Sequence, residues 1–260
     1  MSTNELLLRE DQGAITRLTL NRPAAYNALS LELMERLIDE FANIAADTRI
    51  SVVILRGSGR GFCAGHDLKQ MTEGADHELQ QRTFATCSRL MMTITELPLP
   101  VIAEVHGIAT AAGCQLVATC DLAVCSDDAR FATPGVNIGL FCSTPMVALT
   151  RNIAPKHAME MLLTGEMISA QRAYEMGLVN RVVTADELPK SVMTLAETLA
   201  SKSSATLAVG KQAFHAQLPR SLADAYAHCS EVMTCNIQSE DAQEGIDAFL
   251  NKRTPRWKGR

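Results

Sequence analysis

Aromatic residues are scarce in this chain of 260 residues, because one Trp, three Tyr and seven Phe make up only 4% of it. A surface that stacks single-stranded nucleic acid needs aromatic faces, so the composition argues against that function. Positive charge is not in excess either, since the formal net charge at pH 7 is −5. Proteins that read nucleic acid are normally basic. We therefore expect no nucleic-acid partner.

Long apolar runs are also missing, and none reaches the roughly 18 residues that a membrane-spanning helix requires. We therefore expect no membrane partner. The segment from Met1 to Gln12 is polar and acidic and holds no apolar core, so it predicts neither a signal peptide nor a transit peptide. The expected location is the cytoplasm, or the mitochondrial matrix after removal of a targeting segment.

The eight cysteines include no C-x-x-C pair, and their spacing does not fit a zinc site. Most of them lie within apolar runs, where a free cysteine behaves as a small hydrophobic residue. We expect reduced, buried thiols and no metal. The chain also lacks the phosphate-binding patterns G-x-x-x-x-G-K-[ST] and G-x-G-x-x-G.

The first 140 or so residues alternate short apolar strands with amphipathic helices, which is typical of an α/β protein with a largely parallel sheet. A helix capped by Ser30 is expected to run to about Ala46, and a second long helix is expected to end at Pro98. Phe84 is expected to point inward from that second helix. The predicted strands are 6–9, 15–20, 52–55, 101–105 and 121–126, with a turn at 11–13 between the first two.

The last 115 or so residues are mainly helical. Pro145 is expected at the start of one helix, and further helices are predicted over 155–164, 170–176, 184–201 and 239–251, with a short strand at 182–183. We divide the chain into an α/β core over 1–195 and a C-terminal helical region over 196–260.

Two loops of small residues follow predicted strands, Gly61–Asp67 and Ala109–Gly113. The second loop leads into a helix, so its free backbone N–H groups point along the helix dipole. Two such loops from neighbouring strands could direct N–H donors at one oxygen, which is what an oxyanion hole requires. Glycine-rich turns of this kind are more often structural than catalytic, and the residues alone leave both interpretations open.

Spaced motifs along nearly the whole chain, from about residue 5 to 260, resemble the crotonase (enoyl-CoA hydratase/isomerase) superfamily. The resemblance lies in Asn21-Arg22-Pro23 with Asn27-Ala28-Leu29, Phe62–Leu68, Gly107–Asp121, Phe131–Pro134 with Gly139, Gly165–Val179, and Glu244-Gly245 with Ala248-Phe249. It implies a crotonase-like ββα spiral core with a C-terminal helical trimerisation region. It also implies a homotrimer or a dimer of trimers.

The resemblance further implies that the partner is an acyl-CoA thioester, with no cofactor beyond the coenzyme A of the substrate. Two backbone N–H groups polarise the thioester carbonyl in this family, and they fall at His66 and Ala112. The path of the coenzyme and acyl group would be lined by Ala64, His66, Asp67, Leu68 and Lys69. Residues that reach the adenosine-phosphate end of the coenzyme from a neighbouring subunit match Phe249 and Lys252, within a basic cluster at 252–260.

The chain departs from the family at both acid–base positions. Where hydratases of this family carry two Glu residues, this sequence has Gln115 and Gly135. Glutamine can orient a water molecule but exchanges no proton at neutral pH, and glycine offers no side chain. The loss of both groups predicts very slow hydration. A Gln115→Glu/Gly135→Glu variant is expected to restore it if the pocket is intact.

Other residues could replace the missing carboxylates. Glu104 is either a substitute acid or an edge or inter-subunit carboxylate, His66 could act through its imidazole, and Cys142 could act as a nucleophile if a base lowered its pKa. The other five histidines show no ligand spacing and are expected to be structural.

Two classes of function therefore remain open. The first is an enzyme of the enoyl-CoA hydratase/isomerase group with weak or non-standard hydratase activity, which stabilises a thioester enolate and uses Gln115 to bind water or substrate. An acyl-CoA decarboxylase or thioesterase on the same fold is a variant of it. The second is a noncatalytic acyl-CoA binding or scaffold protein, which the loss of both Glu residues favours.

Overall fold

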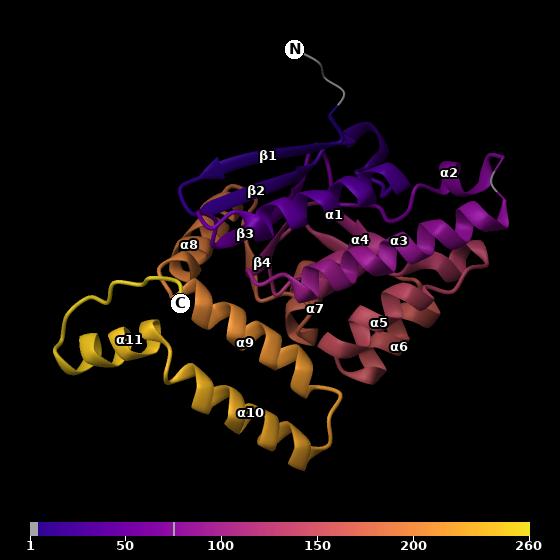
Figure 1. Ribbon diagram of the computed structural model, residues 1–260. Coiled ribbons are helices and arrows are strands. Elements are labelled where there is room, and N and C mark those ends of the chain that lie inside the picture. Colours follow the sequence, from indigo (N-terminus) through magenta and orange to yellow (C-terminus); the bar gives the residue numbers. More distant parts are fainter. Residues whose placement is uncertain (1–4, 75) are drawn as a thin grey trace.

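A six-stranded sheet forms the centre of the computed structural model, which describes residues 5–74 and 76–260 (Figure 1). Its strands lie in the order β1-β2-β3-β4-β6-β9. They are β1 Leu7–Gln12, β2 Ile15–Leu20, β3 Val52–Gly57, β4 Val101–Val105, β6 Leu122–Ser126 and β9 Arg181–Val183. All neighbours pair in parallel except β1 and β2, which form an antiparallel hairpin. The largely parallel sheet predicted from the alternation of elements is confirmed.

A second, three-stranded sheet lies beside the first and supports the two loops of small residues. It consists of β5 Ile108–Thr110, β7 Arg130–Ala132 and β8 Ile168–Ser169, in the order β5-β7-β8. The chain passes from β4 to β5 and again from β6 to β7, so each turn adds one strand to each sheet. This repetition is the ββα spiral that the family resemblance implies.

Helices cover both faces of the main sheet. The larger core contains residues of α1 Leu31–Ala46, α3 His77–Glu96 and α4 Ala112–Thr119, together with one face of the strands. The opposite face packs against α8 Leu188–Ala200 in a smaller apolar cluster. The helices α2 Leu68–Thr72, α5 Ser143–Asn152, α6 Pro155–Thr164 and α7 Ala170–Met176 complete this part of the molecule.

The last three helices stand away from the sheet, as Figure 1 shows in orange and yellow. They are α9 Ser204–Gln217, α10 Leu222–Asn236 and α11 Glu240–Leu250. Neither α9 nor α10 has a fully buried residue. The predicted boundary at 195/196 falls within α8, and α9 is the first helix that leaves the core. The division of the chain into two regions stays a prediction, and its residues 1–4 lie outside the described part.

Four local expectations are wrong. Thr184 does not cap a helix; its hydroxyl donates to Glu187, and α8 begins at Leu188. The helix expected at Pro145 begins two residues earlier, at Ser143. Strand β1 continues to Gln12, because Gln12 pairs with Ile15 and leaves a two-residue turn. Phe84 is 39% exposed and so is not fully inward. Its ring packs edge-to-face on His66, in the loop that follows β3.

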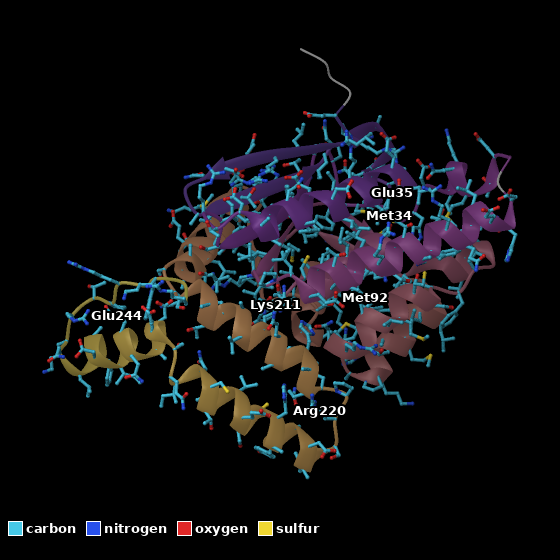
Figure 2. All side chains as sticks on the ribbon, in the orientation of Figure 1. Met34, Glu35, Met92, Lys211, Arg220 and Glu244 are labelled. Atoms are coloured by element: carbon cyan, nitrogen blue, oxygen red, sulfur yellow. The ribbon has the colours of Figure 1, made fainter. Side chains whose placement is uncertain are left out.

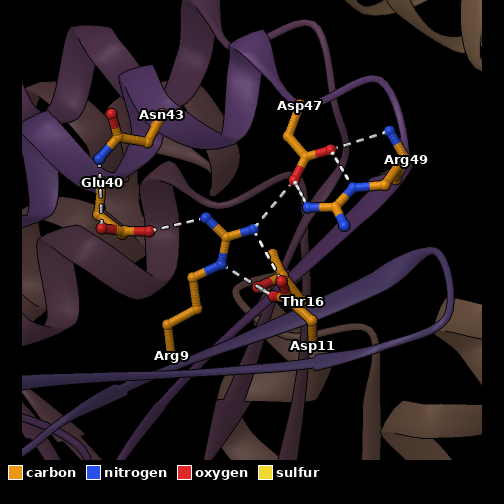
Figure 3. A network of polar contacts seen from close by, with 7 residues as sticks. All are labelled: Arg9, Asp11, Thr16, Glu40, Asn43, Asp47 and Arg49. Carbon is orange, nitrogen blue, oxygen red and sulfur yellow. Dashed lines mark hydrogen bonds and ion pairs between the residues drawn. The ribbon is translucent and has the colours of Figure 1, made fainter.

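A polar network holds α1 against the first hairpin (Figure 3). Arg9 on β1 contacts Asp11 on its own strand, Glu40 on α1 and Asp47 after the helix. Asp47 also accepts from Arg49, and these guanidinium contacts hold the pKa of its carboxyl well below the usual range. This network lies at the edge of the sheet that β1 forms, and it stabilises the fold.

Candidate active site

The two loops of small residues lie against each other, and two glycines make this possible. A Cβ at Gly65 would lie 2.8 Å from Ala111 Cβ and 3.2 Å from Ala112 N, and Gly65 has a φ of +98°. A Cβ at Gly113 would overlap the carbonyl oxygen of Cys63. Since only glycine permits such a close approach of backbone to backbone, these positions bring the loop after β3 against the start of α4.

The two N–H groups that the family resemblance assigns to an oxyanion hole, those of His66 and Ala112, are free in this arrangement. Within the described residues, neither His66 N nor Ala112 N has a hydrogen-bond acceptor, although the neighbouring N–H groups of Asp67 and Ala111 bond to Leu29 and Ala132. Ala112 is the first residue of α4, where helix geometry leaves N–H groups unpaired. The loop contact therefore leaves two donors available side by side.

Ala111 has a strained backbone directly before this helix. Its φ of 50° and ψ of −119° lie in a region that side chains with a Cβ rarely adopt. Strain of this kind costs about 1–3 kcal/mol and gathers at functional sites. It orients the peptide that carries the N–H of Ala112.

The His66 side chain is a buried, neutral ring. It packs edge-to-face on Phe84 with ring centroids 5.4 Å apart. Its Nε2 is buried without a partner among the described residues. Burial lowers the pKa of His66 to about 4, so the imidazole carries no charge at neutral pH. These properties do not suit a base that must hold a proton during turnover.

Gln115 lies one helical turn beyond Ala112 and is only 3% exposed. Its Oε1 accepts a long contact of 3.9 Å from the thiol of Cys87 on α3. Burial raises the pKa of the Cys87 thiol to about 12, so that thiol stays protonated. A neutral amide therefore stands where the family resemblance places the first carboxylate, with a neutral thiol beside it, and no sequence pattern predicted the contact between Cys87 and Gln115.

The position of the second carboxylate is closed. A Cβ at Gly135 would lie 2.7 Å from the carbonyl oxygen of Leu140 and 2.9 Å from the thiol sulfur of Cys142. The same turn is fixed by a 2.9 Å bond from Leu140 N to Gly135 O. A Glu side chain at Gly135 would therefore require this turn or the Cys142 side chain to shift, and the effect of Gly135→Glu on hydration stays a prediction.

Arg22 and Asn27 of the first motif position the loop after β3. Buried Asn27 donates to the carbonyls of Ser58 and Gly61 at 2.8 Å. Arg22 donates to the carbonyl of Ala28 and pairs with Asp67 at 2.7 Å. Asp67 also caps α2, and the Arg22 contact helps to keep the pKa of its carboxyl low. The Asp67 carboxylate, expected to line the substrate path, is thus engaged in holding the loop.

The other residues expected along the path differ in exposure. Ala64 is half-buried, and its carbonyl accepts a 3.0 Å bond from Thr110 Oγ1. Leu68 and Lys69 are exposed at the start of α2. Both side chains therefore face solvent.

Phe249 lies on α11 and Lys252 follows that helix, and Figure 1 shows α11 well apart from α2 and α4 within one chain. Phe249 is 82% exposed on α11. In the basic cluster, Arg253, Lys258 and Arg260 pair with acidic residues of α11, so much of its charge is neutralised.

The residues that could replace the missing carboxylates differ in position and in pKa. Glu104 is 2% exposed, pairs with Arg56 at 3.3 Å, and extends from the sheet face that packs against α8. It is therefore neither an edge carboxylate nor a group at the loops. Burial raises the pKa of the Cys142 thiol, which disfavours a thiolate nucleophile.

Eight free thiols are present, of which six are buried, whereas Cys229 is half-buried and Cys235 is exposed on α10. Among residues 5–74 and 76–260, no group of three or more His, Cys, Asp or Glu side chains is arranged to hold a metal ion. Across the same ranges, no helix has the length and apolarity needed to cross a membrane.

A family model described as enoyl-CoA hydratase/isomerase matches residues 10–260. The chain belongs to the enoyl-CoA hydratase/isomerase family. Its fold is the crotonase fold, as the motifs predicted.

The chain is similar to the mitochondrial enoyl-CoA hydratase domain-containing protein 3 of Danio rerio, with 45% identity over 98% of this chain and 88% of the relative. A solved enoyl-CoA hydratase of Mycobacterium smegmatis matches with a TM-score of 0.95 and 49% identity over 98% and 99% of the two chains. The solved human enoyl-CoA hydratase domain-containing protein 3 matches with a TM-score of 0.95 and 46% identity over 97% and 100%. Segments 109–116 and 139–145 look most like this branch of the family, and the comparisons confirm that resemblance.

Proposed function

We propose that the protein binds acyl-CoA thioesters and stabilises a thioester enolate through the N–H groups of His66 and Ala112. The observation that carries this proposal is the pair of unpartnered N–H groups in two loops that touch at Gly65. A carbonyl oxygen between them would accept two hydrogen bonds, which strengthen as negative charge develops on the oxygen. The positive end of the α4 dipole adds to this stabilisation.

Gln115 is a buried polar side chain one helical turn beyond Ala112 on α4. It would orient a water molecule or a substrate oxygen through its amide. No acid–base group replaces the two family carboxylates, and each such group typically contributes about 10²–10⁴ in rate. The proposed activity is therefore a weak or non-standard hydratase or isomerase reaction.

A second candidate is noncatalytic binding of acyl-CoA, and the closed position at Gly135 favours it. Without a second acid, the proposed oxyanion hole would bind the thioester, and no side chain would transfer a proton to or from it. Turnover of crotonyl-CoA that falls in a Gln115→Ala variant would exclude this candidate. Binding with no turnover in either protein would favour it over the first.

We also propose that copies associate through α9, α10 and α11, as a trimer or a dimer of trimers. Large apolar side chains are exposed on α10 and α11, namely Leu222, Tyr226, Met233, Phe249 and Leu250. In such an assembly, Phe249 and Lys252 would reach the coenzyme bound to a neighbour. A cytoplasmic or mitochondrial-matrix location stays a prediction, although relatives of this branch carry the word mitochondrial in their names.

The test compares crotonyl-CoA with its thioether analogue, which lacks the carbonyl. Two hydrogen bonds at about 1 kcal/mol each predict that the thioester binds at least about tenfold more tightly. Ala112→Pro removes one of the two N–H donors and should reduce that difference. Thermal unfolding followed by circular dichroism controls for the fold. Equal affinities of the two ligands for the unmodified protein would contradict the proposal.

A further inference from the structure

The C-terminal residues 253–260 fold back along α11 and end beside the start of α9 (Figure 1). We call this segment the C-terminal strap. All eight of its residues are described and none lies in a helix or strand, so its backbone N–H groups need other partners. Three of these groups bond to the carboxylates of Asp241 and Glu244 on α11. They belong to Arg256, Lys258 and Gly259.

Asp241 is the centre of these contacts, and it is only 1% exposed in the first turn of α11. Its Oδ1 accepts from Lys258 N at 2.6 Å, and its Oδ2 accepts from Gly259 N at 3.0 Å. Two successive N–H groups that converge on one anion form a nest, a common anion-binding arrangement. Oδ2 also accepts from the hydroxyl of Ser203, the N-cap of α9, at 2.6 Å, and the Asp241 N–H donates to the carbonyl of Arg260. One buried carboxylate therefore joins α9, α11 and the end of the strap.

The Asp241 carboxyl is ionised at neutral pH. Burial acts to raise its pKa, but the hydrogen bonds from Ser203 and from the strap hold that pKa below its usual value. A buried charge is stable only while hydrogen bonds replace its lost hydration. The carboxylate and the strap therefore depend on each other. Removing the strap would take donors from the charge, and neutralising the charge would leave the N–H groups of Lys258 and Gly259 with a weaker acceptor.

Two further contacts fix the strap along its length. Trp257 Nε1 donates to the carbonyl of Ser201, the C-cap of α8, at 2.8 Å. The ring of Trp257 lies against Gly245 of α11, where a Cβ would lie 3.1 Å from a ring carbon. Figure 2 shows Glu244 on the side of α11 toward the strap, and Glu244 pairs with Arg253 at 2.7 Å. The strap thus runs from the C-terminal end of α11 back to the junction of α8 and α9.

Packing within α9, α10 and α11 is sparse. All of their residues are described, and only Asp241 and Ala248 of α11 are buried. A cavity of about 530 Å³ lies between α9 and α10, and its lining includes Val209, Val232 and, at the end of the strap, Arg260. An apolar core therefore does not fix the arrangement of these three helices. The strap does so instead, since it ties the last helix to the start of the first.

We propose that the C-terminal strap is a clasp that closes α9, α10 and α11 into one rigid lobe and that the Asp241 carboxylate locks it. When the clasp is closed, the exposed apolar side chains of α10 and α11 keep fixed positions relative to one another. A second copy of the chain then meets a preformed surface, and association does not have to order the lobe. This consequence rests on the proposed assembly, whereas the clasp itself is a property of the single chain.

Hydrogen exchange of the full-length protein, followed by mass spectrometry of C-terminal peptides, tests the clasp. Exchange at the strap N–H groups follows the population in which the clasp is open. Asp241→Asn turns one acceptor oxygen into an amide donor, so exchange in the strap should become at least about tenfold faster. The matched control Glu240→Gln removes an exposed charge from the same turn, where it pairs with the side chains of Lys258 and Arg260. It should change exchange by no more than about twofold.

The fluorescence of Trp257, the only tryptophan of the chain, reports on the same event. Acrylamide should quench it more strongly in Asp241→Asn than in the unmodified protein or in Glu240→Gln, while circular dichroism checks that the core remains folded. A chain that ends at Arg256 is the second variant. It lacks the end of the clasp and leaves Asp241 open to water, so exchange in α11 should become at least about tenfold faster even if Asp241→Asn does not fold.

The outcomes separate the clasp from the proposed assembly. Exchange in the strap that is unchanged in Asp241→Asn, or equally fast in Glu240→Gln, would overturn the clasp. If the clasp preforms the surface, the chain that ends at Arg256 should associate at least about tenfold more weakly in analytical ultracentrifugation. Unchanged association would overturn that consequence alone. A single-chain mass for the unmodified protein would overturn the proposed assembly, and the exchange experiment would still decide the clasp.

Discussion

At the scale of single residues, Gly135 shows how a neighbouring loop can fill the space that a side chain would need. The sequence reveals that the second carboxylate is missing, but not that Leu140 and Cys142 occupy its space. That closure depends on a short turn, in which Gly139 has a positive φ and Leu140 N donates to Gly135 O, and on the placement of the Cys142 side chain. By contrast, Gly65 and Gly113 could be identified from sequence, because small residues after strands indicate close backbone contacts.

We predict that Gly135→Ala destabilises the protein by about 1–3 kcal/mol, because its Cβ would meet the carbonyl of Leu140 and the thiol of Cys142. Urea unfolding measures this change. Adding Cys142→Ala should recover part of it, which a double-mutant cycle reveals as coupling between the two sites. Gly210→Ala, where a Cβ meets open space, should not destabilise the protein. A neutral effect of Gly135→Ala would show that the turn relaxes freely.

His66 predicts a pH dependence of stability. Its pKa is lowered from 6.5 to about 4 by burial, so between these values the unfolded chain binds a proton that the folded chain does not. The free energy of unfolding should therefore fall as the pH drops from about 6.5 to 4, by at most about 3 kcal/mol. His215, whose pKa burial also lowers, acts in the same direction. Urea unfolding of His66→Leu isolates the His66 contribution, and an unchanged pH profile in that variant would contradict the burial argument.

At the scale of elements, capping residues predicted most helix ends correctly. Ser30 caps α1 as expected, since its side chain accepts from a backbone N–H of the first turn, and Ser169 and Ser239 cap α7 and α11 in the same way. The prediction that a helix begins at Thr184 is wrong because the Thr184 hydroxyl donates to the Glu187 carboxylate, so this polar segment forms a turn before α8. The prediction that Phe84 points inward is wrong because helical periodicity identifies an apolar face but does not show how completely neighbouring segments cover that face.

The attachment of α9 depends on one buried lysine. Lys211 has a side chain that is 7% exposed and joins α9 to the carbonyl of Ile94 in the last turn of α3, to the carbonyl of Leu99 after that helix and to Asp121. Lys211→Met leaves the Asp121 carboxylate without its cation, and we predict a loss of up to about 3 kcal/mol. Limited proteolysis should then cut first within α9. The exposed Lys202→Met serves as the matched control, and equal cleavage of both variants would contradict this account.

At the scale of the whole molecule, the C-terminal helices are incompletely buried within a single chain. The family resemblance predicted a helical trimerisation region, and the spiral core that it also predicted is confirmed. We expect a mass of three or six chains in analytical ultracentrifugation. Charged replacements at Leu222 and Tyr226, which are 77% and 70% exposed, should shift that mass toward one chain. A single-chain mass for the unmodified protein would contradict the proposed assembly.

The central claim is that the N–H groups of His66 and Ala112 polarise a thioester carbonyl. The most direct measurement is the infrared stretching frequency of crotonyl-CoA labelled with ¹³C at that carbonyl and bound to the protein. We predict a frequency below that of the free ligand in water, with a return toward the free value in Ala112→Pro. A bound carbonyl whose frequency equals that of the free ligand in the unmodified protein would contradict the account.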